Sequence, residues 1–393
     1  MRRRLGIAIV ALTTVVAGAC SSAGGERAID AAGAGSTSST ASPSSTTSST
    51  GAKSTSSSTS ATTTTTTTTA PAPSGPSSIV QLGDSIASGE GTLYGYTYDQ
   101  SSREWTGGDV NVTWPGPYPL CHQSPDAYGN LVAQHFGANT EFTQLACTGA
   151  TFAHGITTPE LDDGTQMAPA QFGNWSDMTD LNVKYDEAKP DLVMITLGAD
   201  DVQFVDIVEA CIKNGYEYYF DLADLECTAN NPGSTIESDF VDFLPTLKQN
   251  YQTLLTWIEE RAEANDAPMP KVVVTNYPDP LPPDGTKCPD TSWLYPKQTK
   301  YLSSLVGQMN DTIQSSMPTG SSDVLLADVS GAYEANGASH IWCTDDPWAY
   351  GLSIYHVTDR DSFKSQAPFH PTPDGQESIA EHVIPTVRQL FQD

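Results

Sequence analysis

The sequence has few basic residues and lacks a long apolar segment. Lysine and arginine together number 18, against 47 aspartate and glutamate residues, and the formal net charge is −29. A surface with this charge repels phosphate groups, which excludes a nucleic-acid-binding domain and a basic membrane-surface domain. No apolar run reaches the roughly 18 residues that are needed to cross a bilayer. We therefore expect no nucleic-acid partner and no membrane-spanning helix.

The first twenty residues predict an export signal. Three arginines directly after Met1 precede a short apolar segment, and Ala17 and Ala19 form a small-residue cleavage site. We expect residues 1–19 to be removed as a signal peptide. The same cut would place Cys20 at the new N-terminus, as in a bacterial lipobox, and Cys20 is the odd one of seven cysteines. We expect Cys20 to carry a lipid; the alternative is plain secretion with an incidental thiol.

Residues 20–77 predict a linker that holds a domain away from this anchor. Serine, threonine, alanine, glycine and proline dominate the segment, and eight consecutive threonines occupy positions 62–69. Such a composition has too little apolar surface to offset the entropy lost on ordering, so we expect it to be disordered. Residues 78–393 are then one globular domain, which touches the membrane only through the lipid of Cys20.

Six cysteines remain in this domain, and the exported context favours disulfides. We expect them to pair in sequential order: Cys121–Cys147, Cys211–Cys227 and Cys288–Cys343. A zinc site is the rival interpretation. However, no C-x-x-C motif occurs, and His340 and Cys343 form an isolated H-x-x-C pair. We therefore expect no metal.

Apolar strand and helix patterns alternate along the domain. Short apolar runs predict strands at 79–82, 142–146, 192–197, 271–276 and 324–327. Helical spacing of apolar residues predicts helices at 240–258 and 301–313, and Asp374 is the predicted cap of a last helix that runs toward Leu390. This alternation indicates a parallel sheet covered by helices on both faces.

Polar or glycine-rich segments follow three of these strands and precede the last helix. In parallel sheets, functional sites form at the carboxyl ends of the strands. The segments are Gly83-Asp84-Ser85-Ile86-Ala87-Ser88-Gly89-Glu90-Gly91, Ala146-Cys147-Thr148-Gly149-Ala150, Gly198-Ala199-Asp200-Asp201 and Phe369-His370-Pro371. A serine hydroxyl becomes a strong nucleophile when a base takes its proton, and histidine can do so near neutral pH. Backbone N–H groups at a strand-to-helix turn can bind an oxyanion, so this set of residues favours acyl transfer.

These four segments, in this order, resemble the SGNH, or GDSL-type, hydrolases, and above all actinobacterial secreted GDSL-like lipases and esterases. In that group the first segment often continues as S-G-E-G, as at residues 88–91, and the stretch at 121–124 is also similar. The resemblance covers essentially residues 78–393. It implies an α/β fold of the three-layer α/β/α, flavodoxin-like type, with a central parallel five-stranded sheet. It also implies a monomeric carboxylic ester hydrolase without a cofactor, and three disulfides are usual in the group.

The resemblance assigns roles to the matching positions. Ser85 is the expected nucleophile, and His370 is the expected general base and later the acid. The backbone amides of Ser85 and Gly149 are the expected oxyanion donors. The third segment normally reads Gly-x-Asn-Asp, and here Asp200 stands where the donating Asn is usual.

The last segment departs from the family pattern as well. It normally reads Asp-x-x-His, but Ala367 stands three residues before His370. We therefore expect a Ser–His dyad with the backbone carbonyl of Ala367 as the candidate orienter of the ring. Asp361 is an outside candidate for that role.

Purely structural interpretations compete with these roles. Asp84 and Ser85 both suit a helix cap, and Gly149 could serve only a backbone turn. Asp200 or Asp201 could be only a helix cap, because an ionised carboxylate cannot donate a hydrogen bond.

The function expected from the sequence is that of a secreted serine esterase or lipase. A carbohydrate esterase that removes acetyl groups from envelope polysaccharide is one alternative. A non-catalytic envelope-binding protein that keeps the fold is the other, and Asp200 and Ala367 are the features that favour it.

Overall fold

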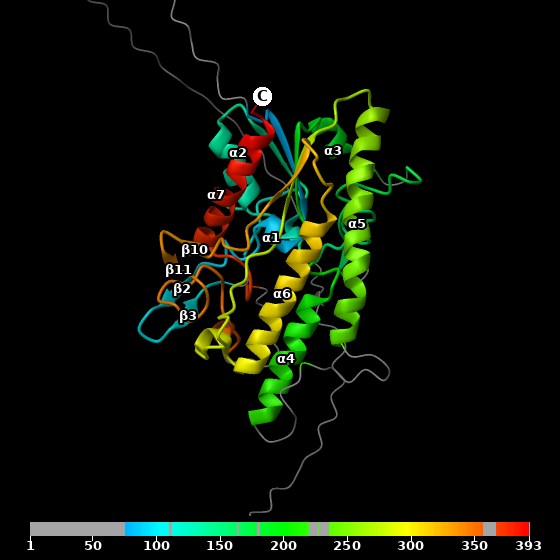
Figure 1. The fold of residues 1–393 in the computed structure, drawn as a ribbon. Helices are drawn as coiled ribbons and strands as arrows, with labels where there is room; N and C mark the ends of the chain where they lie inside the picture. The colour runs from blue at the N-terminus through cyan, green and yellow to red at the C-terminus, as the bar shows by residue number, and fades with distance from the viewer. Residues whose placement is uncertain are drawn as a thin grey trace, which may run out of the picture. The chain divides into compact units, whose positions relative to one another are not determined.

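The computed structural model describes residues 75–109, 112–162, 165–178, 181–219, 227, 236–356 and 367–392 (Figure 1). Cys20 and Asp361, both named above, lie outside the described residues. Within the described part of the chain, no helix is both long and apolar enough to cross a membrane.

Five parallel strands form the central sheet in the order β4-β1-β7-β8-β9. They are β1 (Ser78–Gly83), β4 (Glu141–Gln144), β7 (Leu192–Thr196), β8 (Lys271–Thr275) and β9 (Val324–Ala327). Every residue of β1 and β7 is buried, as expected for strands that are covered on both faces. The five strands and the parallel sheet predicted from the sequence are confirmed, with ends that differ by up to two residues.

Helices cover both faces of the sheet and form a three-layer α/β/α structure (Figure 1). Alternate strand residues point to opposite layers, so that Val80 and Leu82 pack on one side and Ile79 on the other. The first side carries α4 (Phe204–Tyr219), α5 (Ile236–Ala264) and α6 (Pro296–Ser316), and the second carries α2 (Tyr128–Phe136) and α7 (Pro373–Leu390). The predicted three-layer fold is confirmed.

The last helix begins differently from the prediction. Asp374 was the expected cap, but Thr372 caps α7 by accepting the amide of Gly375 at 3.2 Å. Pro373 takes the first helical position because it has no N–H to satisfy there. Asp374 therefore lies inside the first turn.

Shorter elements lie in the connections between these strands and helices. They are α1 (Ser85–Ser88), α3 (Val183–Ala188), the 3-10 turns η1 (Pro119–Cys121), η2 (Pro289–Thr291) and η3 (Leu352–His356), and the hairpins β2–β3 (Tyr96–Asp99, Glu104–Gly107), β5–β6 (Glu160–Asp162, Thr165–Ala168) and β10–β11 (Glu334–Ala335, Ala338–Ser339). Three disulfides join Cys121–Cys147, Cys211–Cys227 and Cys288–Cys343, which are the sequential pairs expected above.

Candidate active site

Ser85 lies where the chain turns sharply from β1 into α1. Gly83 has a φ of +140°, and a Cβ at this position would lie 2.0 Å from the carbonyl oxygen of Thr196, so only glycine fits between the two strands. Asp84 caps α1 by accepting the amide of Ile86 at 3.0 Å. Ser85 is therefore the first residue of the helix, and its side chain is half-buried rather than used as the cap.

Asp84 is a buried carboxylate that ties this turn to the neighbouring strands. It accepts a short hydrogen bond from the Tyr277 hydroxyl, and that hydroxyl in turn accepts the amide of Ala199 at 3.1 Å. Burial raises the pKa of Asp84 to about 7, although the bonds from Tyr277 and from the amide of Ile86 favour the ionised form. The turn that carries Ser85 is thus connected to the segment that follows β7.

Gly149 follows β4 at the same edge of the sheet. Its φ is +76°, which requires glycine, and a Cβ there would meet nothing within 4 Å, so the space beside it is open. The Cys121–Cys147 disulfide and a 3.2 Å hydrogen bond from the Thr148 amide to the Cys121 carbonyl fix this loop. Among the described residues, the amides of Gly149 and Ser85 donate no hydrogen bond, as oxyanion donors require.

The structure distinguishes the two adjacent acids after β7. Asp201 is a structural anchor, since its carboxylate accepts the amide of Phe152 at 3.1 Å and the side-chain amide of Asn250 at 3.3 Å. Asp200 is only partly exposed. Burial, followed by the nearby charges of Asp84 and Asp201, holds the pKa of Asp200 well above its ordinary value. A protonated Asp200 has an O–H and can donate a hydrogen bond.

His370 lies in the loop before α7, where backbone hydrogen bonds hold it. Its amide donates to the Ala367 carbonyl at 3.0 Å, and its carbonyl accepts the Tyr350 amide at 3.0 Å. The predicted orienter, the Ala367 carbonyl, is thus bonded to the backbone of His370. Nδ1 of the ring is buried and has no hydrogen-bond partner among the described residues.

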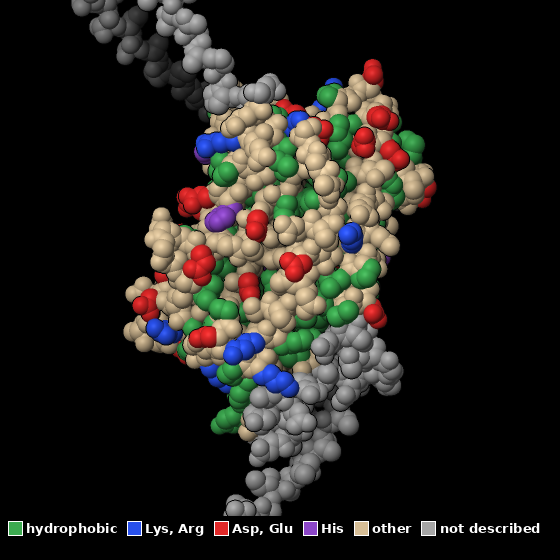
Figure 2. All heavy atoms as spheres, in the orientation of Figure 1, with side chains coloured by type: hydrophobic (Ala, Val, Ile, Leu, Met, Phe, Trp, Pro, Cys, Tyr) green, Lys and Arg blue, Asp and Glu red, His purple; other side chains and the backbone are tan. Residues whose placement is uncertain are grey.

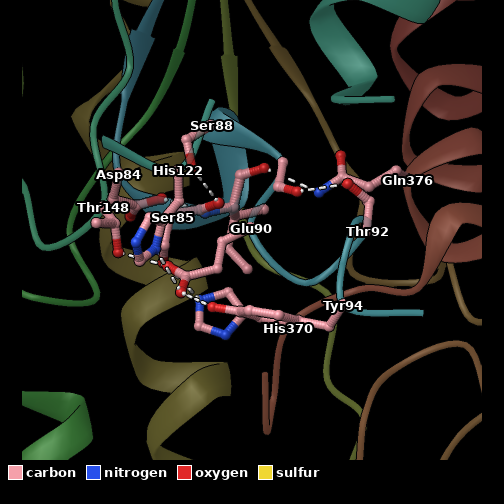
Figure 3. A network of polar contacts seen from close by, with 12 residues as sticks. Asp84, Ser85, Ser88, Glu90, Thr92, Tyr94, His122, Thr148, His370 and Gln376 are labelled. Atoms are coloured by element: carbon pink, nitrogen blue, oxygen red, sulfur yellow. Dashed lines mark hydrogen bonds and ion pairs between the residues drawn. The ribbon is translucent and has the colours of Figure 1, made fainter. Parts of the chain in front are cut away.

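The other ring nitrogen of His370 faces a residue to which the sequence analysis gave no role. Nε2 lies 3.8 Å from Oε2 of Glu90, a fully buried carboxylate in the loop after α1 (Figure 3). The same carboxylate contacts His122 and Thr148. Glu90, which lies in the loop after Ser85, thereby contacts both the loop that carries Gly149 and the loop that carries His370.

Close packing at Gly91 also joins the first and last segments. Gly91 has a φ of +98°, and a Cβ there would lie 3.1 Å from Cβ of His370. The side-chain amide of Gln376, on α7, donates to the Ile86 carbonyl at 3.0 Å. Segments that are almost 300 residues apart in the chain, positions 86 and 376, are therefore in direct contact.

Tryptophans near this edge are mainly packing residues. Trp105, Trp114 and Trp342 are each at most 6% exposed, and Trp114 stacks on His122 with ring centroids 4.9 Å apart.

Within the described residues, no group of three or more histidine, cysteine, aspartate or glutamate side chains is arranged to hold a metal ion. His340 stacks on Trp348 instead, at 3.7 Å.

One protein-family model matches most of the chain. A family model described as the GDSL-like lipase/acylhydrolase family matches residues 82–377. This range contains all four segments of the candidate site. None of the curated proteins matches the chain.

Several solved structures are similar at low identity. An extracellular lipase from Streptomyces rimosus is 22% identical, with 78% of this chain and 96% of that chain covered and a TM-score of 0.43. A phospholipase A1 from Streptomyces albidoflavus is 19% identical, with 78% and 96% covered and a TM-score of 0.42. An aryl esterase from M. smegmatis is 14% identical, with 79% and 98% covered and a TM-score of 0.34. Identities and TM-scores this low say nothing about the substrate of this chain.

Proposed function

The chain belongs to the GDSL-like lipase/acylhydrolase family and is a carboxylic ester hydrolase, and from this premise we propose that it works through an acyl-serine intermediate on Ser85. The family that the motifs predicted is confirmed by the match. One observation carries the proposal. At the edge of the sheet where the turn with Ser85 lies, Glu90 contacts both the loop that carries Gly149 and the ring of His370.

In the proposed reaction, Oγ of Ser85 attacks the ester carbonyl carbon while its proton passes to His370. The carbonyl oxygen becomes an oxyanion, which accepts hydrogen bonds from the amides of Ser85 and Gly149 and from protonated Asp200. When the intermediate collapses, the proton of His370 goes to the departing alkoxide and an acyl-serine remains. Water then attacks the acyl carbonyl carbon while His370 takes one of its protons, and collapse of this second intermediate releases the acid as His370 returns the proton to Oγ of Ser85.

The substrate class is tested with Ser85→Ala and His370→Ala in the domain of residues 78–393. Soluble acyl esters of graded chain length and acetylated sugars are supplied in parallel. We expect wild-type turnover on acyl esters, and we expect Ser85→Ala to reduce kcat by at least about 10³-fold, as loss of a nucleophile does. Selective deacetylation of the sugars would instead support the carbohydrate esterase. Full turnover by Ser85→Ala would rule out the nucleophile.

We also propose that the chain is exported and held on the envelope. In this proposal residues 1–19 are cleaved, Cys20 carries lipid, and residues 20–77 tether the catalytic domain. The three disulfides support an oxidising compartment. Replacement Cys20→Ala is expected to release the protein into the medium. If fractionation finds this variant still on the envelope, the anchor lies elsewhere.

A further inference from the structure

Glu90 is a fully buried carboxylate five residues after Ser85, and its backbone amide donates to the Ser85 carbonyl at 3.1 Å. A buried charge is strongly unfavourable unless paired and hydrogen-bonded groups surround it. Glu90 belongs to no conventional triad position, since the expected acid would stand at Ala367. The partners of Glu90 therefore indicate what it does.

Each carboxylate oxygen of Glu90 has two partners, and the four partners come from four parts of the chain (Figure 3). Oε1 accepts the Tyr94 hydroxyl at 3.1 Å and lies 2.9 Å from Nδ1 of His122. Oε2 accepts the Thr148 hydroxyl at 2.5 Å and lies 3.8 Å from Nε2 of His370. The carboxylate is thus fixed in place from four directions and presents one oxygen to the catalytic ring.

We propose that Glu90 is a positioning residue that supplies the negative charge beside His370 which Asp-x-x-His supplies in other members of the family. This inference rests on the proposed function of Ser85 and His370. Glu90 contacts no reacting atom in this account; it acts through the imidazole.

His122 has a supporting role in the same arrangement. Its ring is held between Glu90 and the face of Trp114, with an interplanar angle of 21° to the indole. Burial alone would raise the pKa of Glu90, but the charge of His370 and the hydrogen bond from His122 outweigh it and the pKa lies below its ordinary value. Protonated His370 therefore favours the ionised form of Glu90, and the hydrogen bonds from His122 and Thr148 favour that form as well.

The consequence for catalysis follows from the proton path. The Ser85 proton moves to His370, which becomes a cation, and later moves on to the leaving alkoxide; Glu90 takes no proton. A fixed anion beside the ring stabilises the cation that exists only between those two transfers. The loss of the anion should therefore lower kcat more than it changes KM.

The titratable groups that face Glu90 are Tyr94, His122, His370 and, at longer range, Asp200. Two of these groups, His370 and Asp200, affect different limbs of a pH–rate profile. The acid limb reports the base, because protonated His370 cannot take the Ser85 proton. The alkaline limb reports Asp200, which ceases to donate when it ionises. We therefore choose the Asp200→Asn background, in which the alkaline limb contributed by Asp200 is removed.

The test compares Glu90→Gln with Tyr94→Phe in that background. Glu90→Gln keeps the shape but removes the charge; we expect kcat to fall at least about tenfold, with KM nearly constant and the acid limb moved to lower pH. Tyr94→Phe removes one hydrogen bond to Glu90 but keeps the charge, so the acid limb should stay in place. Glu90→Asp keeps a displaced charge and should restore part of kcat.

The outcomes separate this inference from the proposed function. If the parent enzyme hydrolyses esters and Glu90→Gln has the same kcat and the same acid limb, Glu90 has no positioning role. If Glu90→Gln does not fold, Glu90→Asp decides, and an unchanged kcat and acid limb in that variant would contradict the inference. A wild-type protein without any turnover would contradict the proposed function instead.

Discussion

An ionised Asp200 side chain would oppose the reaction in the role that is proposed for it. The tetrahedral intermediate carries a negative oxygen, which an anionic neighbour repels. Four other acids, Asp84, Asp201, Glu160 and Glu90, lie close enough for their charges to add to burial and raise the pKa of Asp200. The acidic neighbourhood therefore makes Asp200 a potential donor, in the role that Asn normally has.

The substitution Asp200→Asn tests this protonated donor. Because the donor is present only below the raised pKa, wild-type kcat should fall as pH rises through it, while the Asn variant should keep its kcat there. A lost oxyanion donor reduces kcat by about 10²–10³-fold, which sets the expected size of the alkaline difference. Both proteins are assayed across the pH range on one soluble ester. Identical profiles and rates would remove Asp200 from the oxyanion hole.

The sequence predicted the identity of the main candidate residues but missed the carboxylate between them. Ser85, Gly149 and His370 each stand in a recognisable segment at a strand end. Glu90 stands within such a segment, yet the role proposed for it depends on His370, which comes 280 positions later in the chain. His122 lies 32 residues after Glu90, and only the folded loops bring the two side chains together.

At the scale of secondary structure, α1 and the segment after β7 are held together by one tyrosine. The Tyr277 hydroxyl donates to Asp84 at the cap of α1 and accepts the Ala199 amide next to Asp200. Tyr277 itself follows β8 in the sheet. Three neighbouring parts of the site therefore share one hydroxyl group.

We expect Tyr277→Phe to reduce kcat about tenfold, a loss of ~1.4 kcal/mol of transition-state stabilisation, with little change in KM. The variant leaves the Ala199 amide without its acceptor and raises the pKa of Asp84 further. Tyr251→Phe is the matched control, since that hydroxyl bonds both backbone groups of Leu197 but has no hydrogen bond to Asp84. Both variants should melt at lower temperature. An equal loss of kcat in the control would show that only general stability was lost.

The sequence predicted the layered core well but not the small elements around the site. Strands such as 192–196 are unbroken apolar runs, which burial on both faces demands. The hairpin β2–β3 has only one buried residue in its second strand, Trp105, and its pairing depends on long-range packing against Tyr350. Local patterns carry no signal for such contacts.

At the scale of the whole molecule, the protein carries an excess of acid both outside and inside. Acidic side chains are spread over the visible face and outnumber the basic ones (Figure 2). Inside, burial raises the pKa of Asp84 and Glu160 to about 7 and that of Asp201 and Asp290 to about 6. In all four cases the folded state holds its proton to higher pH than an unfolded chain does.

The stability of the protein should therefore increase as pH falls from about 8 to about 5. A group with a raised folded-state pKa contributes stability that is complete below its unfolded pKa and is lost as pH rises to the folded pKa. Glu90, Asp99, Asp284, Asp323 and Asp328, whose pKa values are lowered, act in the opposite sense, but only near and below their unfolded pKa of about 4. We expect Tm to rise by at least about 3 °C, which is roughly 1 kcal/mol for a domain of this size.

Calorimetry of the wild type and of Glu160→Gln measures this dependence. Glu160 is buried, and its Oε2 has no hydrogen-bond partner among the described residues, so the variant removes one proton-linked group with little change in shape. The pH dependence of Tm should be shallower in Glu160→Gln. A Tm that falls on acidification over this range would show that the buried carboxylates ionise normally.

The central claim is that Ser85 is an activated nucleophile, and covalent labelling tests it most directly. A fluorophosphonate probe reacts with serines whose proton a neighbouring base removes. We expect intact mass to show one adduct per chain, peptide mapping to place it on Ser85, and His370→Ala to be labelled far more slowly. An unlabelled wild-type protein, or a Ser85→Ala variant that is labelled equally well, would contradict the account.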